Sequence, residues 1–183
     1  MIDYGEFQYA AAHWTGVRLF TDLANQVGFE FDKAVCQITF RPFVGPSKVI
    51  RVTTVIHPMD WLHQAYSWLH YQPLTFNGYI PKSGEWLNLN QSSFTAFVND
   101  YLSRPELKID DVYKRYKADT VLRFEDMPWC AFEFFEALGK IIPSMESIDT
   151  SQVDYSYRIP TEVEIRQRVR RKESELHERY EYY

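Results

Sequence analysis

Apolar side chains recur at a helical spacing in several stretches of the chain. Residues 15–27 place them three or four positions apart, from Val17 to Val27, which is the period of an amphipathic helix. The same kind of pattern predicts further helices over residues 61–71, 93–102, 127–139 and 161–180. Ser92 or Ser93 is the expected N-cap of the helix over 93–102.

Runs rich in β-branched residues mark the expected strands. Residues 48–56 (KVIRVTTVI) are apolar or β-branched almost throughout, which is typical of a central parallel strand. Weaker strand patterns cover residues 34–40 and 120–124. Pro58 ends the central strand, and Asp60 is the predicted N-cap of the helix that follows. A strand leading straight into a capped helix is the unit of an open α/β sheet, in which ligands bind at the carboxyl ends of the strands.

Glycine and proline divide the remaining sequence. Residues 72–91 and 143–160 are predicted loops, and a long loop inside a compact domain often covers a binding site. Residues 111–117 are expected to form a short helix or to lead into a strand. These elements predict one domain over residues 1–183, an α/β fold with an open, mostly parallel sheet flanked by helices.

Composition narrows the function. A net charge of −5 argues against a non-specific nucleic-acid binder, which needs a basic stripe, but it allows a local cationic pocket for a small anion. Aromatic residues make up 17% of the chain; we assign most of them to the core, although some could stack on a base or a sugar.

Cysteine and leader patterns predict a cytoplasmic protein. Cys36 and Cys130 lie far apart without metal-type spacing, as expected for buried thiols in a reducing compartment. The first residues lack the basic-then-apolar order of a signal peptide, and no apolar run is long enough to span a membrane. His63 and His70 share a helix face, but no further ligand has a matching spacing, so we expect no metal.

The sequence Ile-His-Pro-Met-Asp that ends at Asp60 resembles a motif of the sulfotransferases, which move a sulfuryl group from 3′-phosphoadenosine 5′-phosphosulfate (PAPS) to a hydroxyl or amine. In that family a strand ends in Arg-(Asn or His)-Pro-x-Asp and the next helix carries a Ser, and this Arg and Ser hold the 3′-phosphate. His57, Pro58 and Asp60 agree with the motif. Ile56 stands in the place of the Arg and Gln64 in the place of the Ser, so the pairing of a guanidinium with the phosphate is lost.

Two later segments support the same resemblance. Residues 121–127 (VLRFEDM), followed by 134–139 (FFEALG), are similar to the family's late strand and the helix after it. Residues 93–98 resemble the helix that follows the substrate loop in many members. The resemblance covers roughly residues 5–140 and implies a three-layer fold related to P-loop kinases.

Tyr9-Ala10-Ala11-Ala12-His13-Trp14 stands where the family has the phosphate loop Lys-Ser-Gly-Thr-Thr-Trp, and only Trp14 agrees. Backbone N–H groups and a helix N-terminus could still hold an anion there, without the cation and the hydroxyls. The resemblance thus assigns binding of PAPS, or of its product 3′-phosphoadenosine 5′-phosphate (PAP), to Tyr9, Ala10, Ala11, Ala12, His13, Trp14, His57, Asp60 and Gln64.

His13 and Arg41 are the candidate catalytic residues. Many soluble sulfotransferases place a His just after the second strand, and Arg41 occupies that approximate place here. Arg stays protonated, so it would stabilise sulfate charge and not act as a base. His13, expected at the start of a helix, remains the acid–base candidate. The alternatives are a His that caps or packs at a helix end and a surface Arg near a turn.

The acceptor is expected under the loop 72–91, as a small molecule or a carbohydrate. Aromatic rings there could stack on a flat substrate and a lysine could reach an anion, so the candidate substrate-binding residues are Tyr71, Phe76, Tyr79, Lys82 and Trp86. The segment around Lys82 (PKSGEWL) spells the phosphate loop well, but no β-rich run precedes it and no periodic helix follows it directly.

The charged residues 161–180 allow two interpretations. Glutamates surround a basic cluster that consists of Arg166, Arg168, Arg170, Arg171 and Lys172. Mixed charge at this density is typical of a solvated helix with i,i+4 ion pairs. The alternative is a helix that packs against a protein partner or a second copy of the chain.

Two functions follow from the sequence. The first is a sulfotransferase with an unusual donor site between the amino-terminal loop and the helix of Asp60. The second is a non-catalytic protein of the same fold that binds a glycan, a nucleotide or a protein, which the replacements at Tyr9, Ala12, Ile56 and Gln64 favour. A third hypothesis is a P-loop kinase, but the sequence lacks the G-x-x-x-x-G-K-[ST] motif that such a kinase needs.

Overall fold

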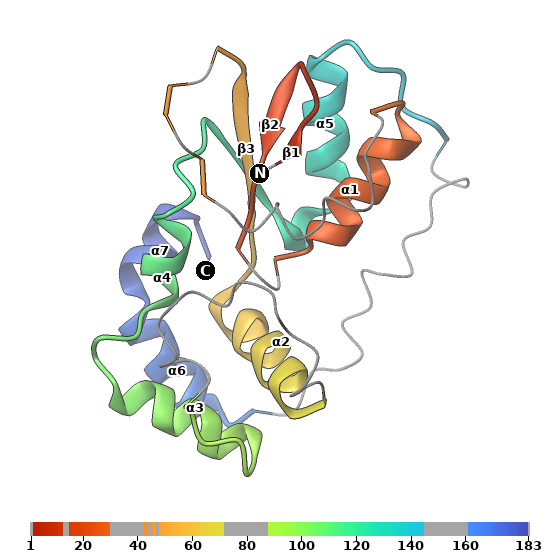
Figure 1. Cartoon of the computed structure of the whole chain (residues 1–183). Helices are drawn as coiled ribbons and strands as arrows, with labels where there is room; N and C mark the ends of the chain where they lie inside the picture. Colours follow the sequence, from red (N-terminus) through yellow and green to blue (C-terminus); the bar gives the residue numbers. More distant parts are fainter. Residues whose placement is uncertain are drawn as a thin grey trace. The chain divides into compact units, whose positions relative to one another are not determined.

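The chain forms two compact units. The computed structural model describes residues 2–12, 15–29, 42–43, 45–46, 48–71, 88–144 and 161–182. Unit 1 consists of Met1–Ile56 and Arg115–Tyr155, and unit 2 consists of His57–Lys114 and Ser156–Tyr183. In their described parts, unit 1 combines a sheet with helices, whereas unit 2 is helical (Figure 1).

The described strands of unit 1 form one open sheet in the order β1-β2-β3-β4. They are β1 (Ile2–Asp3), β2 (Phe7–Tyr9), β3 (Ile50–Val55) and β4 (Thr120–Arg123). β1 runs antiparallel to β2, while β3 pairs in parallel with β2 on one edge and with β4 on the other. The prediction of an α/β protein with a mostly parallel sheet is therefore confirmed. The strand predicted over 34–40 lies outside the described residues.

β3 is the central strand that its composition predicted. Val52 pairs with Tyr9 on one side and with Thr120 on the other. The four residues Val52 to Val55 are at most 3% exposed, which explains why the strand lacks an alternation of polar and apolar positions.

Aromatic rings fill the core of unit 1. The ring of Phe7 is completely buried and lies 5.0 Å from that of Phe29 and 5.1 Å from that of Phe134, both edge to face. Phe20 and Phe135 belong to the same cluster. For these residues, the interpretation of the aromatic content as core is confirmed, since each buried ring removes a large apolar area from water.

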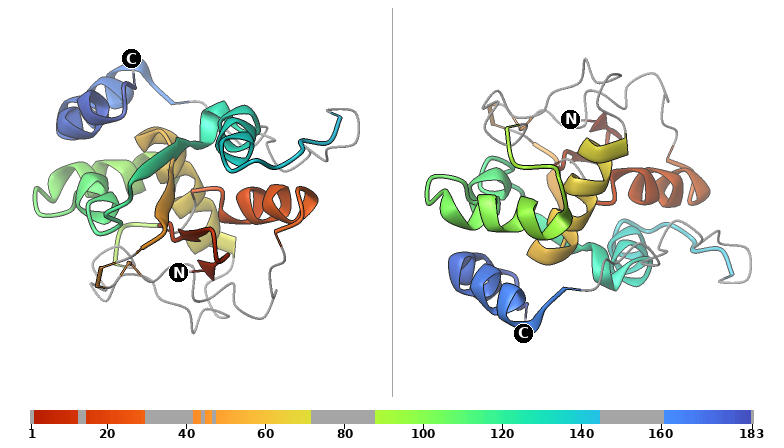
Figure 2. Two further views of the ribbon diagram at one scale, coloured as in Figure 1. Left: turned by 90° about the horizontal axis from the view of Figure 1, so that it is seen from above. Right: turned by 90° about the horizontal axis from the view of Figure 1, so that it is seen from below.

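Two helices of unit 1 lie side by side on one side of the sheet (Figures 1 and 2). They are α1 (Val17–Gln26), predicted over 15–27, and α5 (Trp129–Ala137), predicted over 127–139. A single turn of 3-10 helix, η2 (Phe124–Asp126), follows β4 directly and precedes α5.

Unit 2 contains α2 (Pro58–Tyr71), α3 (Phe94–Ser103), α4 (Ile109–Tyr113), α6 (Val163–Lys172) and α7 (Ser174–Arg179). α6 packs against both α2 and α3, and α7 packs against α4. The two charged helices at the end of the chain thus contact helices far from them in sequence (Figure 1). The predicted loop residues 72–87 and 145–160 lie outside the described part.

One predicted helix cap is confirmed and another is wrong. Ser93 Oγ accepts a hydrogen bond from the N–H of Ala96 at 3.1 Å, as expected of an N-cap. Asp60 does not cap α2, because the helix already begins at Pro58. Proline suits the first helical position, where its φ is already helical and no N–H is needed. Asp60 lies instead in the first turn, where a carboxylate favours the positive end of the helix dipole.

The helix predicted over 161–180 is interrupted at Glu173, between α6 and α7. The Glu173 side chain is 1% exposed and accepts hydrogen bonds from the Tyr101 hydroxyl and from the N–H groups of Ile109 at 3.0 Å and Asp110 at 3.1 Å. One carboxylate therefore joins α3, the first N–H groups of α4 and the α6–α7 corner.

The ion pairs seen for α7 reach residues of α4 and Lys114 after it, instead of the preceding turn of the same segment. Glu175, which a continuous helix would place beside Arg171, approaches Lys114, the residue after α4, at 3.3 Å. Arg179 pairs with the buried Asp110 at 2.5 Å. After the interruption at Glu173, the side chain of Glu175 therefore lies near the end of α4. Among the described residues, no helix combines the length and apolar character needed to cross a membrane.

Gly16 is expected to resist replacement by alanine. It precedes α1 with a φ of +79°, and a Cβ there would lie 2.1 Å from the Phe124 side chain. We expect Gly16→Ala to lower the free energy of unfolding by about 2–4 kcal/mol in urea denaturation, through backbone strain and the clash together. The matched control is Gly28→Ala, where φ is +87° but nothing lies within 4 Å of the added Cβ. Equal losses for the two variants would contradict the predicted clash.

Glu173 is expected to dominate the stability of unit 2. Glu173→Ala removes the acceptor of three buried hydrogen bonds and should cost about 3 kcal/mol of unfolding free energy. Glu173→Gln retains one acceptor oxygen and should cost less. The exposed Glu178→Ala on α7 is the control and should change stability by less than about 0.5 kcal/mol. A loss for Glu173→Ala no larger than the control's would disprove the capping role.

Candidate functional site

The loop after β2 stands where the resemblance places a phosphate loop, at the carboxyl end of a parallel strand. Ala10, Ala11 and Ala12 are at most 1% exposed. The N–H of Ala10 donates to the carbonyl of Val52 at 3.1 Å, which continues the pairing with β3. These three residues are packed into unit 1, and their side chains offer neither charge nor hydroxyl groups.

Tyr9, at the position of the family's lysine, is completely buried and belongs to a chain of hydroxyl groups. Its hydroxyl lies 2.8 Å from Thr54 Oγ1, which lies 3.2 Å from Thr15 Oγ1. Thr15 Oγ1 donates its hydrogen to the carbonyl of Ala12 at 2.7 Å. Because each hydroxyl has one hydrogen, Thr54 must donate to Thr15, and Tyr9 must donate to Thr54.

This chain of donors fixes Tyr9 as a neutral group. Burial raises its pKa well above the usual value near 10, so the phenol stays protonated at physiological pH. Ile56, in the place of the family's phosphate-binding Arg, is 1% exposed. Neither position can supply the positive charge that a phosphate requires.

The residues of unit 2 that were predicted to bind PAPS lie at or near the start of α2. His57 is half-buried, and its Nδ1 accepts a hydrogen bond from the N–H of Met59 at 3.2 Å. Its carbonyl accepts from the N–H of Trp61 at 2.9 Å, so His57 caps α2 with both its ring and its backbone. Asp60 is half-buried and Gln64 is exposed on the same helix.

His57 also belongs to an aromatic cluster inside unit 2. Its ring lies edge to face against the rings of His177 at 5.2 Å and Tyr182 at 5.3 Å. His177 Nδ1 lies 2.8 Å from the carbonyl of Tyr182 and must donate, because a carbonyl can only accept. These contacts support a structural role for His57.

Most candidate residues for catalysis and for the acceptor lie outside the described residues. They are His13, Arg41, Phe76, Tyr79, Lys82 and Trp86, and Trp14 of the predicted PAPS site also lies outside the described part. Tyr71 is the last residue of α2. Of the described residues that were predicted to bind PAPS, Tyr9 to Ala12 belong to unit 1, whereas His57, Asp60 and Gln64 belong to unit 2.

Cys130 is not an activated nucleophile. Its thiol donates to the carbonyl of Arg123 at 3.4 Å, and burial raises the pKa of Cys130 to about 12. Within the described ranges, no group of three His, Cys, Asp or Glu residues is arranged to hold a metal ion.

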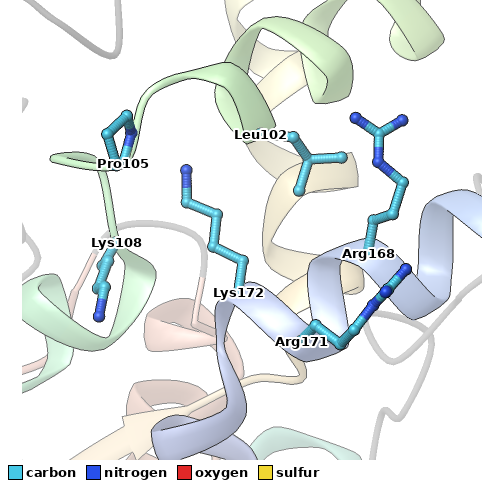
Figure 3. A pocket seen from close by; sticks show the side chains of 6 residues that line it. All are labelled: Leu102, Pro105, Lys108, Arg168, Arg171 and Lys172. Carbon is cyan, nitrogen blue, oxygen red and sulfur yellow. The ribbon is translucent and has the colours of Figure 1, made fainter.

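Sequence patterns did not single out Lys108, which lines a surface hollow with three residues of the charged carboxyl-terminal segment, Arg168, Arg171 and Lys172 (Figure 3). Lys108 precedes α4 and the other three lie on α6, so no local sequence signal connects them.

The hydroxyl chain of unit 1 can be tested by a double-mutant cycle. Tyr9→Phe and Thr54→Val should each lower the unfolding free energy by about 1–2 kcal/mol, because each removes a buried hydrogen-bonding group. The double variant should lose about 1 kcal/mol less than the sum of the single losses, since the two hydroxyls bond to each other. Strict additivity in urea denaturation would mean that the two hydroxyls do not interact.

Comparison with protein-family models, with curated proteins and with solved structures found no match for this chain.

Proposed function

We propose that this chain is a non-catalytic binding protein on a sulfotransferase-like scaffold, with a glycan, a nucleotide or a protein as its ligand. The observation that carries the proposal is the complete burial of Tyr9 and its hydrogen bond to Thr54. A neutral, fully bonded phenol occupies the position at which the resemblance expects a lysine.

The lack of positive charge at the predicted PAPS site favours a binding function over sulfuryl transfer. PAPS bears several anionic groups, and both holding it and stabilising its leaving phosphate require positive charge. In the described part of unit 1, the positions that the resemblance assigns to the donor are Tyr9, Ala10, Ala11 and Ala12, and none of them is ionised at neutral pH. Ile56 also replaces an arginine, so two expected cations are missing from buried positions.

The sheet supports the scaffold part of the proposal. Three of the segments that resemble the family are β2 with its loop, β3 and β4, which are neighbouring parallel strands. Their carboxyl ends share one edge of the sheet, where open α/β sheets bind ligands. On this basis we also propose the three-layer, P-loop-kinase-related arrangement that the resemblance implies.

Sulfuryl transfer from PAPS is the second candidate function, and the same shared edge of β2, β3 and β4 favours it. In that case the missing charge would come from Arg41 and Lys82, with His13 as the acid–base group.

The two functions differ in how they bind the product nucleotide PAP. We expect calorimetric titration at low salt to give no binding at millimolar PAP, or binding that Arg41→Ala and Lys82→Ala change less than about twofold. The exposed Lys117→Ala of unit 1 is the charge-matched control.

Micromolar PAP binding that either Arg41→Ala or Lys82→Ala weakens about tenfold, with Lys117→Ala unchanged, would establish a rebuilt donor site and overturn the non-catalytic function. A screen of hydroxyl and amine acceptors with PAPS would then follow.

A further inference from the structure

The hollow beside α6 gathers four cations in a protein whose net charge is −5. Its volume is ≈ 560 Å³, and it is lined by Leu102, Pro105, Lys108, Arg168, Arg171 and Lys172. Figure 3 shows Lys108 on one side, Arg168 and Arg171 on the other, and Lys172 between them. None of the lining residues is acidic.

The protein partners of these cations are uncharged. Lys172 Nζ donates to the carbonyl of Arg104 at 2.6 Å and to the carbonyl of Tyr101, and it lies 4.0 Å from the centre of the Tyr101 ring. Arg168 donates to Asn99 Oδ1 at 3.0 Å. The side chains of Lys108 and Arg171 make no hydrogen bond or ion pair with any residue in the described part of the chain. Arg168 and Lys172 are therefore held by uncharged groups, and none of the four cations forms an ion pair with a described carboxylate.

Two carboxylates near the hollow in sequence are bonded to other groups, and a third acts on Lys172 without forming an ion pair with it. Glu173 is turned inward onto Tyr101 and the start of α4. Asp100 pairs with Arg104 at 3.1 Å. Glu106, an exposed residue, is the further carboxylate whose charge acts on Lys172. Burial lowers the pKa of Lys172, which shows that its ammonium has lost part of its hydration and would gain from an anionic partner.

We propose that this hollow is a binding site for a small, multiply charged anion that carries phosphate or sulfate ester groups. Guanidinium groups pair with such tetrahedral oxyanions through two parallel hydrogen bonds, and lysine adds a point charge. Leu102 and Pro105 provide apolar surface for the uncharged part of the ligand. The size of the hollow fits a small molecule, and the negative net charge disfavours a long nucleic acid.

This inference rests on unit 2 alone and does not depend on the resemblance or on the absence of a donor site. Phosphate and sulfate esters share a tetrahedral arrangement of anionic oxygens but differ in charge, so both sources are tested. The probes are inorganic pyrophosphate and a trisulfated disaccharide, titrated calorimetrically into the full chain at low salt.

Arg171→Glu is the test variant. The Arg171 side chain is exposed and makes no hydrogen bond or ion pair with a described residue, so its replacement should leave folding intact. Arg166→Glu is the matched control, with the same charge change on an exposed position of α6 outside the hollow. Lys108→Ala is a second variant from a different segment. Thermal unfolding of each variant verifies that it is folded.

We expect at least one probe to bind, and Arg171→Glu to weaken that binding about tenfold, while Arg166→Glu changes it less than about threefold. The tighter probe then identifies the ester class, and added salt should weaken the binding. Failure of both probes to bind at millimolar concentration, or equal losses for Arg171→Glu and Arg166→Glu, would overturn the proposal. A PAP affinity that depends on Arg171 and not on Arg41 or Lys82 would place PAP in this hollow and leave the proposed function standing.

Discussion

β3 is hydrogen-bonded by parallel strands on both edges, and the rest of unit 1 is arranged around this pairing. Parallel neighbours bring the carboxyl ends of the strands to one edge of the sheet, where Gly16 and Phe124 meet. Burial of β3 also forces the hydroxyl of Thr54 to find a partner inside the protein. Tyr9 and Thr15 supply that partner, so the side chain at the position of the family's lysine is directed inward and remains neutral.

In unit 2 a buried carboxylate has the corresponding organising role. Glu173 accepts three hydrogen bonds that join α3, α4 and the α6–α7 corner, which is why the charged segment is interrupted there. The interruption directs Glu175 toward Lys114 and leaves Arg171 without the acidic neighbour of a continuous helix. The charge of Arg171, which Glu175 would face in a continuous helix, is thus left available to a ligand in the hollow.

Local signals predicted the elements well wherever neighbours in sequence decide the structure. The dense β-branched run gave β3, and Ser93 gave the start of α3, because both depend on a few adjacent residues. The cap at Asp60 was wrong because proline and the His57 ring together satisfy the start of α2 two residues earlier. The interruption at Glu173 could not be predicted. The groups that donate hydrogen bonds to its carboxylate belong to Tyr101 and Ile109, which are more than sixty residues away in sequence.

The amino-acid sequence by itself determined the α/β class, the central strand and the absence of a lysine and an arginine from the positions of the resembled motifs. These are matters of residue type and of periodicity, which need no knowledge of distant contacts. Only the tertiary structure decided what the residues at those positions do instead: the buried hydroxyl of Tyr9 bonds to Thr54, and His57 caps α2. It also decided that Lys108 lines a cationic hollow together with residues of α6. The physical reason is that burial and uncompensated charge belong to the surroundings of a side chain, which are assembled from segments far apart along the chain.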